Sequence, residues 1–308
     1  MINKNMKKYL LGKYLILFLV LCCIPSIASA SSIYFETSKD TVFVGDTFII
    51  SVKIDSEKTK INSVEGDIVL NQTNNVAVND FSLAKSVFSL WPRTPSLSTD
   101  GNTISFVGGV PGGFDLDKAI VFNIIVEANK EGEVKISPKN IAVFANDGSG
   151  TKVPVTFKNL TLKILPKNNS VASSNEWLGV VSSDKINPEK FDIVVGKDAS
   201  LFEGKRFAFF TAVDNQSGVS YYEVSENGTK AVRSGSMYVL LNQDENTPPR
   251  LEVTAYDKAG NKTVSVYKKP AVTIFGFSIN FIVTLFVIVI LFILIRKILK
   301  IRKIKKNV

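Results

Sequence analysis

The chain of 308 residues contains no histidine and only two cysteines, Cys22 and Cys23. Without histidine, a Ser-His-Asp triad and histidine-ligated zinc sites are excluded. Both cysteines lie in an N-terminal segment that we expect to be removed, so the mature protein has neither disulfides nor a thiol nucleophile. We predict no catalytic residues and no enzyme activity, because no spacing of the acidic residues singles out a catalytic pair. Stability is then expected to come from buried apolar cores alone.

The net charge of +9 does not indicate nucleic-acid binding, because the excess lies at the two ends of the chain. Four lysines precede residue 30 and seven basic residues follow Ile295, which leaves 26 basic against 28 acidic residues between them. A nearly balanced middle gives no basic surface for a phosphate backbone. We therefore predict no nucleic-acid partner.

Both ends have the patterns of membrane targeting. Residues 1–30 combine lysines, an apolar run and the small triplet at 28–30, which is typical of a cleaved signal peptide; an uncleaved anchor is the alternative. Residues 271–295 carry no charge and are long enough to cross a bilayer, and a basic tail follows at 296–308. We expect a single-pass protein of the cell membrane that contacts the lipid bilayer through residues 271–295, with its N-terminus extracellular and its C-terminus cytoplasmic.

The segment between these ends has the pattern of an all-β protein. Phe48, Ile50, Val52 and Ile54 alternate with mostly polar residues, as in a strand with one buried face. No stretch before residue 271 has a sustained helical period. We predict two tandem antiparallel β-sandwiches at 31–166 and 177–269, a linker at 167–176 and one C-terminal transmembrane helix. Within residues 102–114 we predict a short strand that ends in a glycine-rich bend leaving the sheet.

Several short motifs occur in the same order as in cohesin domains. They are Val44-Gly45-Asp46, residues 61–66, Ser89-Leu90-Trp91 with Pro95, residues 106–111 and residues 145–151. Residues 31–166 thus resemble a cohesin, which implies a jelly-roll-like sandwich related in fold to some carbohydrate-binding modules. The resemblance implies a non-catalytic recognition protein of the cell surface, which binds a dockerin-like module or polysaccharide and has a link to polysaccharide catabolism. A structural or adhesive envelope protein with neither ligand is the alternative.

The resemblance also implies where a ligand binds. In cohesins the dockerin-binding face includes the strand similar to residues 61–71, whose outward positions here are Ser63, Glu65 and Asp67. An ordinary solvated sheet face is the alternative. Trp91 and Phe114 stand beside flexible Gly-Pro turns and are candidates for an aromatic platform that stacks on sugar rings. A core position is the alternative for Trp91.

The second sandwich is similar to bacterial immunoglobulin-like repeats, which usually serve as spacers. The similarity rests on two turn-rich phrases, residues 214–223 and 255–261. Asp214 and Asp257 within them, and the loop at 146–150, carry oxygens that suit calcium. Tight turns explain the same residues without a metal, so we predict no cofactor and keep calcium as the alternative.

Overall fold

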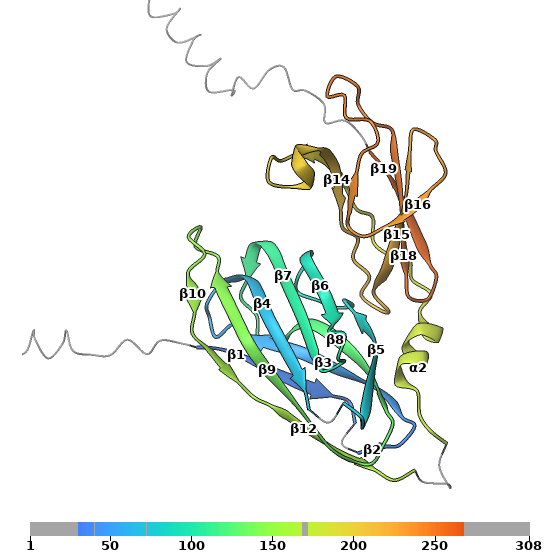
Figure 1. The fold of residues 1–308 in the computed structure, drawn as a ribbon. Coiled ribbons are helices and arrows are strands. Elements are labelled where there is room, and N and C mark those ends of the chain that lie inside the picture. Colours follow the sequence, from blue (N-terminus) through green and yellow to red (C-terminus); the bar gives the residue numbers. More distant parts are fainter. Residues whose placement is uncertain (1–29, 40, 72, 168–171, 268–308) are drawn as a thin grey trace, which may run out of the picture. The chain divides into compact units, whose positions relative to one another are not determined.

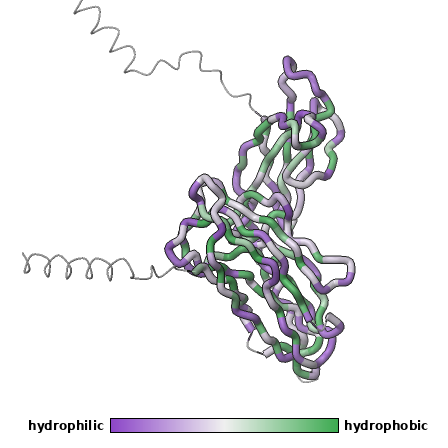
Figure 2. The backbone as a smooth tube through the Cα atoms, turned by 60° about the vertical axis from the view of Figure 1, so that its left-hand side comes forward, coloured by the Kyte–Doolittle hydropathy of each residue, from purple (hydrophilic) through white to green (hydrophobic). Residues whose placement is uncertain are grey.

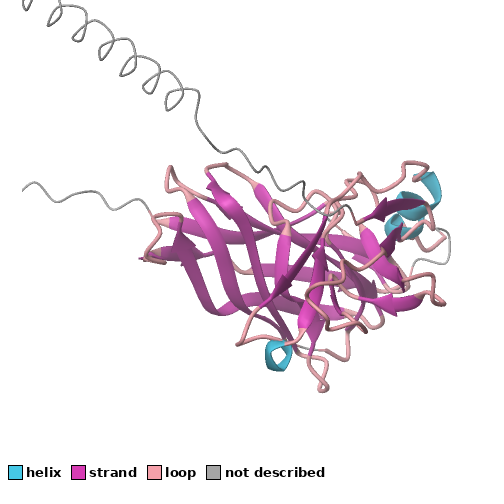
Figure 3. Cartoon of the chain, turned by 90° about the horizontal axis from the view of Figure 1, so that it is seen from above, coloured by secondary structure: helices cyan, strands magenta, loops and turns pink. Residues whose placement is uncertain are grey.

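The computed structural model describes residues 30–39, 41–71, 73–167 and 172–267 (Figure 1). Strands make up nearly all of the regular structure, and helix is limited to short pieces (Figure 3). None of the helices in this described part is long and apolar enough to cross a membrane. The predicted signal peptide, the predicted span at 271–295 and the basic tail lie outside the described residues.

The first module consists of two β-sheets with the strand orders β11-β1-β3-β8-β5 and β2-β12-β9-β4-β7-β6, and β10 pairs with β9. Its strands are β1 Ser31–Thr37, β2 Val42–Phe43, β3 Thr47–Asp55, β4 Ile61–Leu70, β5 Val76–Ser82, β6 Leu90–Leu97, β7 Thr103–Phe114, β8 Ala119–Ala128, β9 Gly132–Ala145, β10 Lys152–Val153, β11 Val155–Phe157 and β12 Leu160–Leu165. Most neighbours are antiparallel, as predicted. The pairs β1–β11 and β2–β12 are parallel, which the sequence pattern did not indicate.

The core of this module follows from the alternation seen in the sequence. Phe48, Ile50, Val52 and Ile54 of β3 are fully buried, and the residues between them are mostly part-exposed. Phe122 of β8 lies among the aromatic rings, 5.0 Å from the Phe106 ring centroid in an edge arrangement. Hydrophobic stretches run along the strands and hydrophilic ones mark many turns (Figure 2). The predicted strand pattern of the first module is therefore confirmed.

The predicted glycine-rich bend is wrong, because β7 continues as a strand to Phe114. Gly108 is extended and allows close packing, since a Cβ there would lie 2.8 Å from the Phe88 ring and 3.0 Å from the Trp91 ring. Gly113 has a positive φ of 67° where the register against β4 shifts. The glycines thus let the strand bulge and pack tightly without ending it.

The second module has two antiparallel sheets, β13-β14-β17 and β16-β15-β18-β19. Its elements are α2 Glu176–Ser183, β13 Ile193–Lys197, a 3-10 turn Phe202–Gly204, β14 Arg206–Phe210, β15 Val219–Glu226, β16 Val232–Ser234, β17 Met237–Val239, β18 Leu251–Asp257 and β19 Lys262–Val266. A separate apolar core, which includes Phe210 and Val253, holds the sheets together. The immunoglobulin-like assignment stays a prediction.

The all-β prediction did not include the helix α2, which begins at Glu176. Asn175 caps it, and its side chain accepts a hydrogen bond from the Leu178 N–H at 2.8 Å. A helix of only eight residues is too short to show a helical period in the sequence. The capping residue is the signal that was overlooked.

Candidate functional site

Strand β4 carries the three residues predicted to form a ligand face. Val64 and Ile68 point into the core and are fully buried, whereas Glu65 is exposed and Ser63 and Asp67 are part-exposed. The two-residue period of a strand accounts for this division. Their placement on the outer side of the sheet agrees with the sequence, and their role in binding stays a prediction.

Neighbouring strands extend this surface. Glu65 lies opposite Val107 of β7 and Ala142 of β9, and Val107 lies opposite Arg93 of the edge strand β6. Because adjacent strands are about 4.8 Å apart, the backbones of Arg93 and Glu65 are separated by about 10 Å. Two register shifts in β6 disrupt its alternation, so the sequence did not indicate Arg93. We call Ser63, Glu65, Asp67, Arg93, Ser105 and Val107 the ligand face.

The carboxylates of the ligand face differ in how they are held. Asp67 accepts a hydrogen bond from the Ser105 hydroxyl at 2.7 Å and another from the Asn140 side-chain amide at 3.1 Å, which orients it. Glu65 forms no ion pair with any described residue, and neither does Arg93. Unpaired charges of both signs on one sheet face are available to a partner with the opposite pattern.

The two candidate platform rings do not lie in equivalent places. Phe114 is 7% exposed and stands edge-on to Phe88, so it has no free face for a sugar, and the platform role predicted for it is not supported. Trp91 is part-exposed, but its ring packs edge-on against Phe88 and Phe122 with centroids 5.8 and 6.3 Å away. These contacts favour the alternative that Trp91 belongs to the rim of the core.

The loop at 146–150 folds as a tight turn. The Asp147 carboxylate accepts hydrogen bonds from the backbone N–H groups of Ser149 at 2.9 Å and Thr151 at 3.5 Å. Donation from the Thr151 side chain and then from these N–H groups lowers the pKa of Asp147. The Asp147 oxygens thus serve the turn, which favours the turn over a calcium loop.

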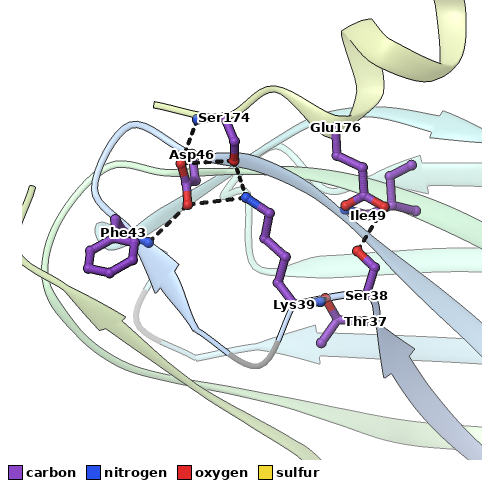
Figure 4. Close-up of polar contacts among 8 residues, drawn as sticks. All are labelled: Thr37, Ser38, Lys39, Phe43, Asp46, Ile49, Ser174 and Glu176. Atoms are coloured by element: carbon purple, nitrogen blue, oxygen red, sulfur yellow. Dashed lines mark hydrogen bonds and ion pairs between the residues drawn. The ribbon is translucent and has the colours of Figure 1, made fainter. Parts of the chain in front are cut away.

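A second polar cluster joins the predicted linker to the first module (Figure 4). One Asp46 oxygen accepts hydrogen bonds from the Ser174 N–H at 2.8 Å and its hydroxyl at 3.0 Å. The other accepts from the Phe43 N–H and the Lys39 amino group, both at 3.2 Å. The Thr47 N–H donates to the Ser174 carbonyl oxygen at 2.9 Å. Residues 174–176, which we call the clip, therefore bind to the start of β3.

Glu176 completes the clip. One of its carboxylate oxygens accepts a hydrogen bond from the Ile49 N–H at 3.1 Å, and the other accepts from the Ser38 hydroxyl at 2.8 Å. Asn175 forms a parallel bridge with Thr47. The described end of the predicted linker thus continues the sheet beside β3, an arrangement that polar composition alone did not indicate.

The clip should depend on the charge of Asp46. Burial alone would raise the pKa of Asp46, but donation from Ser174 and Phe43 outweighs it, and the net pKa is lowered. The stabilisation is therefore present above the ordinary pKa and is lost as the pH falls through the lowered folded pKa. At pH 7 we expect Asp46→Asn to lower the free energy of unfolding by about 1–2 kcal/mol.

The measurement is thermal unfolding of wild type and Asp46→Asn across a series of acidic pH values. The difference should shrink toward zero once wild-type Asp46 is protonated. Asp117→Asn is a matched control, because Asp117 is exposed and lies in the same module. A difference that stays constant down to the acid limit would contradict a charge-dependent clip.

Cohesin modules are among the solved structures to which this chain is similar. No protein-family model matches the chain, and no curated protein sequence does. A cohesin module from a family 33 glycoside hydrolase of Clostridium perfringens is 14% identical, with a TM-score of 0.38, over 45% of this chain and 99% of the module. A non-cellulosomal cohesin of Archaeoglobus fulgidus is 16% identical, with a TM-score of 0.36, over 44% of this chain and 91% of its own.

A third similar structure is a type I cohesin–dockerin complex from Clostridium thermocellum. It is 11% identical, with a TM-score of 0.39, and covers 45% of this chain and 95% of its own. This chain is thus similar to cohesin modules over less than half of its length and over nearly the whole of each module.

Proposed function

We propose that the chain is a non-catalytic recognition protein that binds a dockerin-like protein module through the ligand face. The observation that carries this proposal is the exposed, unpaired Glu65 in one row with Arg93 across the neighbouring strands β4, β7 and β6. The resemblance of the sequence to cohesins supports the same face. Charged groups that the protein itself leaves unpaired give a partner both orientation and specificity.

A protein partner fits this face better than a polysaccharide. Sugar recognition commonly uses an exposed aromatic ring, and Phe114 is buried while Trp91 packs against two core rings. The predicted outer positions of β4, Ser63, Glu65 and Asp67, are small or charged instead. Polysaccharide binding is therefore the second outcome that a binding screen should separate from the first.

We further propose that the protein is held at the cell surface by the apolar residues 271–295, with the basic tail in the cytoplasm. Support comes from the sequence, because that stretch is uncharged and seven basic residues follow it. Membrane fractions washed with alkaline carbonate should retain the full chain. A chain truncated before residue 271 should instead be released, and its retention would contradict the proposed anchor.

The ligand face is tested by Glu65→Ala combined with Asp67→Ala. We expect binding to a responsive dockerin module to weaken at least tenfold, because truncating one partner of a hydrogen-bonded charge pair that a complex buries typically costs about 2–5 kcal/mol. The free energy of unfolding should change by about 1 kcal/mol or less, since both side chains lie on the surface. Binding of the full chain to a panel of dockerin modules and to a glycan array, each with and without calcium, is the measurement.

The matched control is Asp117→Ala combined with Glu131→Ala. It removes the same charge from exposed positions of the same module that lie outside the ligand face. Control and wild type should bind equally. Unchanged affinity in the folded Glu65/Asp67 variant would contradict the face, and glycan binding without dockerin binding would favour the second candidate.

A further inference from the structure

Three buried aspartates meet within the second module. Asp184 caps the C-terminal end of α2, Asp214 lies in the turn after β14, and Asp257 ends β18. Their exposed fractions are 1%, 4% and 2%. One carboxylate oxygen from each lies within 4.8 Å of the other two. The fold thus gathers three acidic side chains that are far apart in the sequence.

No basic side chain balances these carboxylates. The ion pairs among the described residues are formed by Asp46, Glu36, Glu245, Glu203 and Asp80, and none involves the three aspartates. Burying a charge without a counter-charge is costly, and three like charges repel one another in addition. A bound cation would remove both costs.

Hydrogen bonding leaves one oxygen of the cluster open. Asp184 accepts from Ile186 through one oxygen and from Ser217 through the other, and both Asp257 oxygens accept from Asn261. Asp214 accepts through Oδ1 only, from the N–H groups of Gln216 at 3.2 Å and Gly218 at 2.6 Å. No described residue donates to its Oδ2. Asp214 is 96% buried, and since no fully enclosed side-chain oxygen among the described residues lacks a partner, its Oδ2 still has contact with solvent.

We propose that Asp184, Asp214 and Asp257 bind a calcium ion. The ligand atoms are all carboxylate oxygens. Such ligands suit calcium and magnesium better than zinc or copper, which prefer softer ligands. Calcium takes six to eight oxygens at 2.3–2.6 Å in flexible geometry, and carboxylate oxygens within 4.8 Å of each other can share one such ion. Magnesium requires a stricter octahedron at about 2.0–2.1 Å and keeps most of its water, so it fits less well.

A calcium ion would tie the end of α2, the turn after β14 and the end of β18 to one point. The site is separate from the ligand face, and its test is independent of any dockerin.

The first test is a titration of the purified full chain, stripped with a chelator, with calcium chloride alone. Isothermal calorimetry should give a binding step that saturates. Since calcium binds the folded chain, the melting temperature should rise by roughly 10 °C when calcium is 100 times its Kd. Magnesium chloride at the same concentration should raise it less. Absence of both the binding step and the thermal shift would overturn the proposal.

Substitution of single aspartates tests whether the calcium-dependent rise in melting temperature arises at this cluster. Asp214→Asn keeps the acceptor for Gln216 and Gly218 but removes the charge, so the chelated variant should melt no lower than the chelated wild type and should lose the calcium-dependent rise. Asp257→Asn is a second variant with the same expectation. Asp192→Asn is the matched control, because Asp192 is exposed in the same module, and it should keep the full rise. A full calcium response in folded Asp214→Asn and Asp257→Asn would overturn this site.

Discussion

Trp91→Ala is expected to lower the free energy of unfolding by about 3 kcal/mol, the range found for large buried aromatic residues. The ring is part-exposed, yet it packs edge-on against Phe88 and Phe122, and it lies against the bare backbone of Gly108. Removal of the indole ring should leave a cavity, because Gly108 has no side chain that could fill the space. Chemical denaturation monitored by circular dichroism measures the loss.

Phe157→Ala is the matched control for this prediction. Phe157 lies in β11 and is 47% exposed, so its removal should change the free energy of unfolding by no more than about 0.5 kcal/mol. A sugar platform would behave differently from a core ring. If Trp91→Ala changes the free energy of unfolding as little as the control does but loses binding on a glycan array, the core assignment of Trp91 is wrong. The result would then support Trp91 as a sugar-binding platform.

Gly66→Ala is expected to cost about 3 kcal/mol and to weaken ligand binding as well. Gly66 lies between Glu65 and Asp67, and its φ of 151° disfavours any residue with a side chain. An added Cβ would lie 2.6 Å from Ile141 Cδ1 and 2.8 Å from Ile141 Cα, so β9 would have to move. Overpacking and backbone strain each contribute about 1–3 kcal/mol.

Gly112→Ala separates the two contributions. Gly112 also has a positive φ, 80°, but nothing lies within 4 Å of the Cβ it would gain. It should therefore cost only the strain of the left-handed conformation, about 1–2 kcal/mol. Equal costs for Gly66→Ala and Gly112→Ala would show that contact with Ile141 is unimportant. Dockerin binding by both folded variants then reports whether the register of β4 matters to the ligand face.

Local alternation allowed much of the first module to be predicted. The buried residues of β3 and the outward positions of β4 follow from a two-residue period. The continuation of β7 through four glycines did not follow. Glycine indicates a bend when only its neighbours in the chain are considered. Here the lack of a Cβ at Gly108 instead leaves room for the rings of Phe88 and Trp91.

Contacts between distant segments account for the rest. Asp184 joins Asp214 and Asp257 across 30 and 73 residues of sequence, and no local pattern connects it to them. The clip is similar, because Ser174 and Glu176 find their partners about 130 residues upstream, at Asp46 and Ile49. Arg93 was missed because bulges in β6 break its alternation. Such groups become visible only when the sheets are assembled.

The clip also decides how the first module responds to a pull from its C-terminal side. The Ser174 carbonyl oxygen and the Glu176 carboxylate accept the N–H groups of Thr47 and Ile49, and both donors lie in β3, an interior strand of the five-stranded sheet. Tension that arrives at Glu176 therefore passes into β3 directly. The applied force is then resisted by the whole five-stranded sheet that contains β3, and the end of β12 is not peeled away first.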